Sequence, residues 1–91
     1  MNDKQAQRVI ALLGRYFDSH AFIRKYMEKY PKAYAEIVSN HKTLKAAHAT
    51  IGKFLLDNSA TLNITKLGEI ESLNVLMKPS SNALWLNYNN L

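Results

Sequence analysis

The chain has 91 residues, of which 47% are hydrophobic and 10% aromatic, so it can form one domain with its own core and is not a disordered tail. It has no cysteine, which excludes disulfides, thiolate nucleophiles and zinc–thiolate sites. Its net charge of +5 comes entirely from residues 1–57, where ten Lys and Arg stand against five Asp and Glu. Basic charge confined to one part favours an anionic partner, although it also serves solubility.

No apolar run is long enough for a transmembrane helix. The first residues also lack the apolar region and cleavage site of a signal peptide. We therefore expect a cytoplasmic protein that does not enter a membrane.

The first predicted helix spans residues 3–17, with Asp3 as its N-cap. Apolar side chains recur at helical spacing on one side, and Lys4, Arg8 and Arg15 lie on the other. A basic stripe of this kind is most often a solvent-exposed face. It gains meaning only if it lies beside another basic face in the fold.

A second helix, with Asp18 or Ser19 as its N-cap, is predicted over 19–30, and a short third helix over 31–39. Pro31 cannot continue a helical hydrogen-bond ladder, but it suits the first turn of a new helix. The alternative is a single helix kinked at Pro31. The spacing of Tyr34, Ile37 and Val38 predicts that the third helix buries them.

The fourth predicted helix, residues 43–57 with Thr43 as N-cap, has two unlike faces. Its apolar face is made by Leu44, Ala47, His48, Ile51, Phe54 and Leu55. Its opposite face combines small residues with lysines: Lys42, Lys45, Ala46, Ala49, Thr50 and Lys53. One face is expected to be buried, and the other could approach a phosphate backbone closely.

After residue 57 the helical periodicity gives way to β-prone segments separated by turn signals. We predict a β-hairpin over about 67–88, with strands near 67–77 and 83–88. The first strand could be either 68–72 or 73–77. Trp85 is expected to cover the helical core, whereas an exposed Trp85 would suggest a binding hot spot. The predicted fold is α+β and mostly helical, with four helices before a C-terminal hairpin.

The candidate catalytic and metal-binding residues are few. His20, His41 and His48 lack the spacing of a metal-binding helix. We expect His48 at the core edge, bonded to a backbone carbonyl, and the other two at the surface or as caps. Glu69 and Glu71 are expected to face solvent. No catalytic motif is present, so we predict no enzymatic activity, no cofactor and no metal.

A short helix, a tight turn, a longer helix and a hairpin follow the order of a winged helix-turn-helix. The leading prediction is therefore a nucleic-acid-binding protein. Its expected contacts are Lys42, Lys45, Ala49, Thr50 and Lys53, with Lys4, Arg8 and Arg15 of the first helix. The outer face has no Arg, Asn or Gln for bidentate base contacts, and the hairpin turn adds only Lys78. Binding is thus expected to be largely non-specific and made to phosphates.

The competing prediction is a non-enzymatic protein-interaction module or a dimeric regulator. In that case the exposed alanines of the fourth helix, with Leu56 at their margin, would form the interface with a protein partner or a second copy.

Three fragments resemble small uncharacterised bacterial proteins of the kind found on mobile elements. They are Asp18-Ser-His-Ala-Phe-Ile23, His48-Ala-Thr-Ile-Gly-Lys-Phe-Leu55, and Ser72-Leu-Asn74 followed by Ala83-Leu-Trp85. The resemblance implies that the fourth helix and the hairpin form one packed unit. It implies no known activity and transfers no functional residue.

Overall fold

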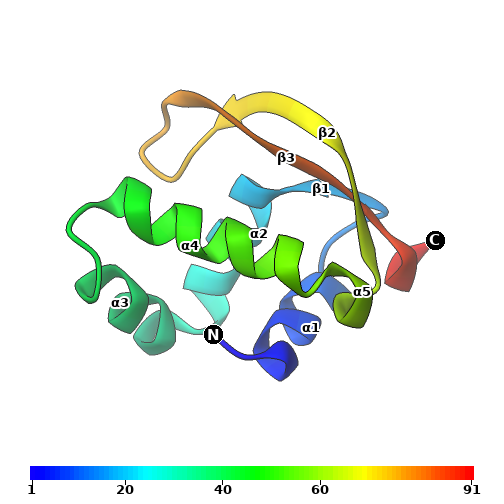
Figure 1. Ribbon diagram of the computed structural model, residues 1–91, viewed down its shortest axis with the longest axis horizontal. Helices are drawn as coiled ribbons and strands as arrows, with labels where there is room; N and C mark the ends of the chain where they lie inside the picture. The colour runs from blue at the N-terminus through cyan, green and yellow to red at the C-terminus, as the bar shows by residue number, and fades with distance from the viewer.

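Five α-helices lie on one side of a three-stranded antiparallel sheet (Figure 1). This computed structural model describes all residues, 1–91. The elements are α1 (Asp3–Ala11), β1 (Tyr16–Asp18), α2 (Ser19–Lys29), α3 (Pro31–Ser39), α4 (Leu44–Asp57), α5 (Ser59–Leu62), β2 (Ile64–Leu73), β3 (Pro79–Asn87) and a final 3₁₀ turn, η1 (Tyr88–Asn90). The predicted α+β class and the C-terminal hairpin are confirmed.

The sheet has the strand order β1-β3-β2, so β1 and β2 are its two edges. β2 and β3 form the hairpin, which pairs from Ile64 with Asn87 to Leu73 with Pro79 and is interrupted by a bulge between Lys66 and Gly68. The short strand β1 was not predicted, because three residues carry too little periodicity to be recognised.

The first helix is shorter than the predicted span 3–17, because α1 ends at Ala11. The side-chain amide of Asn87, which is fully buried, closes this end. It donates to the carbonyl oxygens of Ile10, Leu13 and Gly14 at 3.0, 3.3 and 3.1 Å. Tyr16 and Phe17, which the prediction places in this helix, belong to β1 and pair with β3 instead. Arg15 therefore lies between α1 and β1, and not on a helix.

Side-chain caps begin three of the helices. The α1 cap is Asn2 and not the predicted Asp3, since Asn2 Oδ1 accepts from the Gln5 amide at 2.9 Å. Asp18 caps α2 and Thr43 caps α4 as predicted, through bonds from the amides of Ala21 and Ala46 at 2.8 and 3.0 Å.

α2 and α3 are separate helices and not one kinked helix, because Tyr30 has φ −129° and ψ 62°. Pro31 occupies the first turn of α3, where its missing amide proton costs no hydrogen bond. The prediction that Tyr34, Ile37 and Val38 are buried is only partly correct, since all three are half-buried.

The segment after α4 departs from the predicted hairpin bounds. The unpredicted helix α5 ends at Asn63, whose φ of 58° is left-handed, and β2 begins at Ile64. The alternative strand 73–77 is wrong, because these residues form most of the turn. Asn74 Oδ1 accepts there from the amides of Leu76 and Lys78 at 2.9 and 3.2 Å.

The core lies between the sheet and the helices and is closed by Trp85, which is only 1% exposed. Its Nε1 donates to Ser19 Oγ at 3.0 Å, so the polar atom of the ring is also satisfied. Phe17 of β1 lies opposite Trp85 in the sheet and is buried. The prediction that Trp85 covers the helical core is confirmed. Tyr16 falls within the predicted first helix but lies on β1, where it is 59% exposed because strand residues alternate between faces.

Candidate functional site: a cavity between α4 and the hairpin

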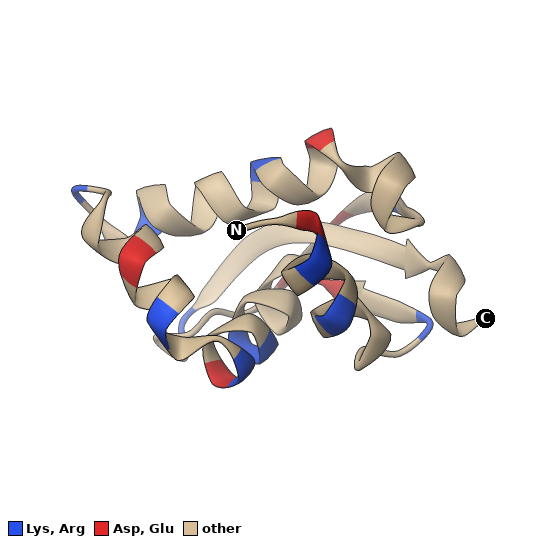
Figure 2. Ribbon diagram, turned by 90° about the horizontal axis from the view of Figure 1, so that it is seen from below, with Lys and Arg blue, Asp and Glu red and all other residues tan.

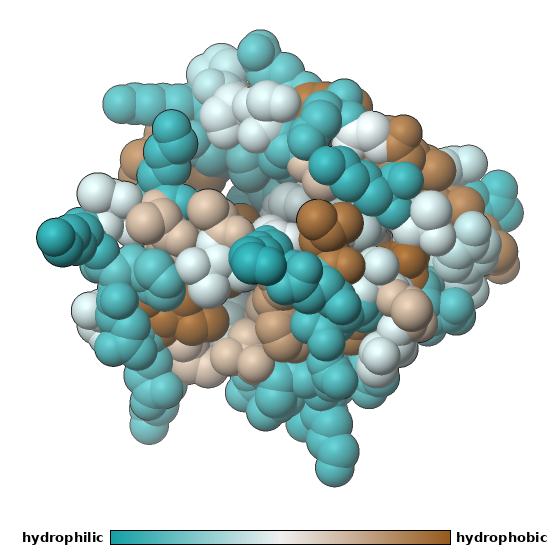
Figure 3. All heavy atoms as spheres, viewed as in Figure 1, coloured by the Kyte–Doolittle hydropathy of each residue, from teal (hydrophilic) through white to brown (hydrophobic).

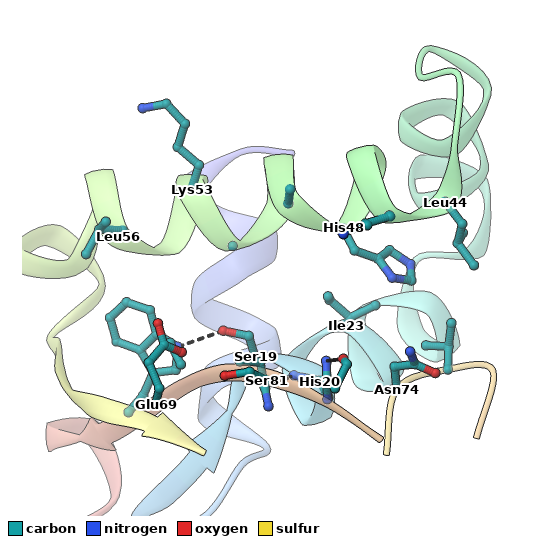
Figure 4. Close-up of a pocket in the computed structure, with 18 of the residues that line it drawn as sticks. Ser19, His20, Ile23, Leu44, His48, Lys53, Leu56, Glu69, Asn74 and Ser81 are labelled. Atoms are coloured by element: carbon teal, nitrogen blue, oxygen red, sulfur yellow. Dashed lines mark hydrogen bonds between the residues drawn. The ribbon is translucent and has the colours of Figure 1, made fainter. Parts of the chain in front are cut away.

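A cavity of about 760 Å³ separates α4 from the β2–β3 hairpin (Figure 4). Its walls come from three parts of the chain: the start of α2, one side of α4, and the hairpin with its turn. In the space-filling view the surface is hollowed between the hairpin and α4 (Figure 3). The volume is in the range of small-molecule sites, and the fold has no other pocket.

α4 has three faces and not the two that its sequence predicts. Three side chains are buried in the core: Ala47, Ile51 and Leu55. Seven residues of the helix line the cavity: Leu44, Lys45, His48, Ala49, Gly52, Lys53 and Leu56. The outward face is exposed and consists of Lys45, Ala49, Thr50 and Lys53, with Lys42 in the turn before the helix. Lys45, Ala49 and Lys53 also border the cavity, so this face reaches its rim. The predicted apolar stripe is therefore divided between the core and the cavity, and its members Leu44, His48 and Phe54 are only half-buried.

His20 is buried and is not the surface residue that the sequence predicts. Its ring bonds to Ser72 Oγ through Nδ1 at 2.8 Å and to Ser80 Oγ through Nε2 at 3.1 Å. The His20 amide donates to Asn82 Oδ1 at 2.8 Å, and Asn82 Nδ2 donates to Ser72 Oγ at 3.1 Å. Asn82 donates to Ser72 Oγ, so the Ser72 hydroxyl proton is available for Nδ1, and in that tautomer Nε2 donates to Ser80 Oγ. The network ties the start of α2 to both strands of the hairpin.

His48 points into the cavity, and its partner is not the predicted backbone carbonyl (Figure 4). Its Nε2 lies 2.7 Å from the hydroxyl oxygen of Tyr34, and Nδ1 makes no hydrogen bond within the protein. Burial lowers the pKa of His48 below its ordinary value, and the nearby His20 lowers it further. The imidazole therefore favours its neutral form and offers one free ring nitrogen to the cavity.

The lysines around the cavity differ in how they are paired. Lys53 bonds to Asp57 at 2.8 Å and extends away from the cavity (Figure 4). Lys66 of β2 bonds to Glu69 at 3.1 Å. Lys45 has no acidic partner within 4 Å. The unpaired positive charge at the edge of the cavity is thus that of Lys45.

Thr50 and His41 join α4 to the turn after α3. Thr50 Oγ1 lies 2.8 Å from His41 Nε2 and donates to the Ala46 carbonyl at 3.2 Å. His41 Nδ1 lies 2.7 Å from the carbonyl oxygen of Ile37 in the last turn of α3, as expected of a cap. The hydroxyl of Thr50, a predicted base contact, is therefore already engaged within the protein.

The basic residues of α1 and α4 belong to different parts of the surface. Lys4 and Arg8 are exposed on α1, and Arg15 is exposed in the segment that follows it. α1 packs mainly on α2 and α5, while α4 packs on α3, α2 and α5. In Figure 2 the Lys and Arg positions are spread over several helices and do not gather on one face. The structure keeps Lys45, Ala49 and Lys53 together but does not bring the α1 group beside them.

The network of His20, Ser72, Ser80 and Asn82 was missed by the sequence analysis. Ser80 and Asn82 alternate along a strand, and such polar alternation normally marks a solvent-facing side. Only the tertiary position of the α2 start, which covers these side chains, makes them buried partners. The sequence therefore indicates that Ser80 and Asn82 lie on the same face of a strand, but it does not indicate that this face is covered.

No group of three or more His, Asp or Glu side chains is placed to hold a metal ion. The helices of this fold also include none with the length and apolar character needed to cross a membrane.

Comparisons of this chain found no matching family model, no matching curated protein and no matching solved structure. The resemblance to small bacterial proteins stays a prediction. Function is therefore argued from the residues of α4, the hairpin and the cavity between them.

Proposed function

We propose that the protein binds nucleic acid through the outward face of α4, with the hairpin beside it, and that its contacts are mainly to phosphates. The observation that carries the proposal is the exposure of Lys45 and Lys53 on α4 and of Lys42 in the turn before it, with the small residues Ala49 and Thr50 between the two helix lysines. Small side chains between lysines allow the helix backbone to approach a duplex closely.

The order of the elements supports this proposal. α3 and α4 are joined by a short turn, residues 40–43, as in a helix-turn-helix pair. The strand order β1-β3-β2, with β1 before the second helix, is also that of a winged helix in which the hairpin is the wing. This is a likeness of architecture, so the residues of α4 must carry the functional argument.

The outward face of α4 also explains why the protein is expected to show little preference for the base sequence of the nucleic acid. It holds no Arg, Asn or Gln that could bond a base edge in two places, and the Thr50 hydroxyl is bonded to His41. Lysines contact phosphates as point charges, without reading the bases. We therefore expect affinity that depends steeply on salt and little on sequence.

The test is the double substitution Lys45→Glu with Lys53→Glu, measured by fluorescence anisotropy with a labelled DNA duplex. We expect at least about a tenfold loss of affinity. The slope of log K against log salt should also flatten by about two, since two phosphate contacts are lost.

The matched control is Lys4→Glu with Arg8→Glu on α1, which changes the net charge by the same amount. It should retain most of the affinity and the full salt slope. Equal losses in the two double variants would mean that only total charge matters, and binding of neither duplex nor single strand by the wild type would overturn the proposal.

A second candidate, dimerisation through the hairpin, is favoured by a separate observation. Five large apolar side chains of the hairpin are exposed: Leu67, Ile70, Leu73, Leu76 and Met77. β2 is a ten-residue edge strand with no neighbour on one side, which is the usual template for pairing with another chain. Sedimentation equilibrium should then give a dimer that Ile70→Lys converts to a monomer; a monomeric wild type at high concentration contradicts this candidate.

A further inference from the structure

The cavity is enlarged by a glycine that packing does not require. Gly52 lies inside α4, where glycine is less favourable than alanine by about 0.5–1 kcal/mol. A Cβ built at this position would meet no atom within 4 Å. The glycine is thus not explained by a close helix contact or by an unusual backbone angle. Its effect is to leave free space at the middle of the helix, on the side that faces the hairpin.

The sides of this space are apolar. Ile23 of α2 and Leu44 of α4 project between the helices and the hairpin, and Leu56 stands near the other end of α4 (Figure 4). Val75 of the hairpin turn and Ala83 of β3 add apolar surface from the opposite wall. A ligand that fits here needs an apolar body, because such a body removes these side chains from water.

The polar groups that remain free favour a negative head group. Lys45 has no acidic partner, whereas the other charges at the cavity, Lys53, Lys66 and Glu69, are all in ion pairs. If the Tyr34 hydroxyl donates to His48 Nε2, the ring proton is on Nδ1, where it can be donated to a ligand. His20 cannot serve in this way, because Ser72 and Ser80 occupy both of its ring nitrogens.

We propose that the cavity binds an amphipathic organic anion, with its apolar chain between α4 and the hairpin and its carboxylate at Lys45 and His48. This site shares Lys45 with the outward face of α4 that is proposed to bind nucleic acid, but its apolar part lies between α4 and the hairpin and needs no nucleic acid. It can therefore be tested with the purified protein alone.

The probe is decanoate, and 1-decanol of the same chain length serves as the uncharged reference. Binding is followed by amide shifts in NMR spectra and by calorimetry. We expect saturable binding of decanoate, with shifts confined to α4, the start of α2 and the hairpin, and at least about tenfold weaker binding of 1-decanol.

Two variants locate the site. Gly52→Leu places a bulky side chain in the middle of the cavity while improving helix propensity, and it should weaken decanoate binding at least about tenfold. Lys45→Gln should weaken decanoate binding and leave 1-decanol unchanged. Ala35→Leu, on the exposed side of α3, is the matched control for added bulk and should bind as the wild type does.

Three results would overturn the proposal: no saturable binding of decanoate, equal binding of decanoate and 1-decanol, or unchanged decanoate binding in a folded Gly52→Leu. Circular dichroism shows whether that variant is folded. If it is not, Lys45→Gln, a change at an exposed side chain, decides the question by its effect on the two probes.

Discussion

Around α1 the sheet and the helices are in close contact, whereas near the hairpin turn the sheet stands apart from α4. In the first region Trp85, Phe17 and Ile10 are buried, and the amide of Asn87 satisfies three carbonyl groups. In the second region Leu76 and Met77 are exposed and the cavity separates the hairpin from α4. The hairpin therefore belongs to the core at one end and to the candidate site at the other.

The difference in packing between the two regions indicates which part of the fold provides stability and which part is available for binding. The close-packed region places enough apolar surface out of water to hold a domain of this size together. The open region makes fewer apolar contacts, so changes there should affect binding more than folding. The first two of the following predictions compare a substitution in one region with a matched one in the other, and the last two concern the open region alone.

The largest effect is expected for Trp85→Ala. Removing the whole ring from the core should lower the free energy of unfolding by about 3–5 kcal/mol, because it leaves a large cavity and frees Ser19 of its partner. The control is Leu76→Ala, which truncates an exposed side chain of the hairpin turn and should change stability by less than about 0.5 kcal/mol. Urea unfolding measures both, and comparable losses would show that the two regions are equally packed.

The next largest effect is expected for Asn87→Ala, which should lower the free energy of unfolding by about 1–3 kcal/mol. The substitution removes a buried amide that donates to three carbonyl groups at the end of α1. Asn74→Ala, the same change in the hairpin turn, should cost less because the amides it frees can reach water. Urea unfolding measures both variants, and a larger loss for Asn74→Ala would contradict the assignment of the two regions.

Gly52→Ala should raise the free energy of unfolding by about 0.5–1 kcal/mol. The added methyl group meets open space, so helix propensity acts without a steric penalty. Thermal or urea unfolding measures the gain. A destabilised variant would mean that the hairpin lies closer to α4 in solution and that no cavity separates them at Gly52.

The smallest effect is expected from pH. Because burial lowers the pKa of His48 below its ordinary value of about 6.5, the unfolded chain takes up a proton more readily than the folded protein. The stability that neutral His48 contributes is therefore present above this pH and is lost as the pH falls towards the lowered pKa. His48→Gln should reduce the loss of stability between about pH 8 and about pH 5.5. Urea unfolding at both pH values measures it, and an unchanged pH dependence would contradict a buried, neutral His48.

Most of the helices could be predicted from the sequence, because their caps and apolar spacing are local signals. Thr43 and Asp18 cap α4 and α2 as predicted, and Pro31 begins α3. Predictions failed where a distant residue decides the local structure. Asn87 lies more than seventy residues from the end of α1 that it closes, and β1 exists only because β3 pairs with it.

The candidate site was predicted less well than the fold. The exposed lysines of α4 follow from its period, but the cavity depends on how far the hairpin stands from the helix, and no local pattern encodes that distance. The helical period therefore puts His48 on the buried apolar face and gives Gly52 no role, whereas in the structure both residues line the cavity beside the hairpin.

The sequence by itself determined the α+β class, the order of the main helices and the hairpin, and the basic outward face of α4, since periodicity and capping act through neighbours in the chain. Only the tertiary structure decided which side of α4 faces a cavity and which histidine is buried. Those outcomes depend on contacts between segments far apart in the sequence, such as His20 with Ser72 and Ser80, and such contacts form only when the packed elements bring them together.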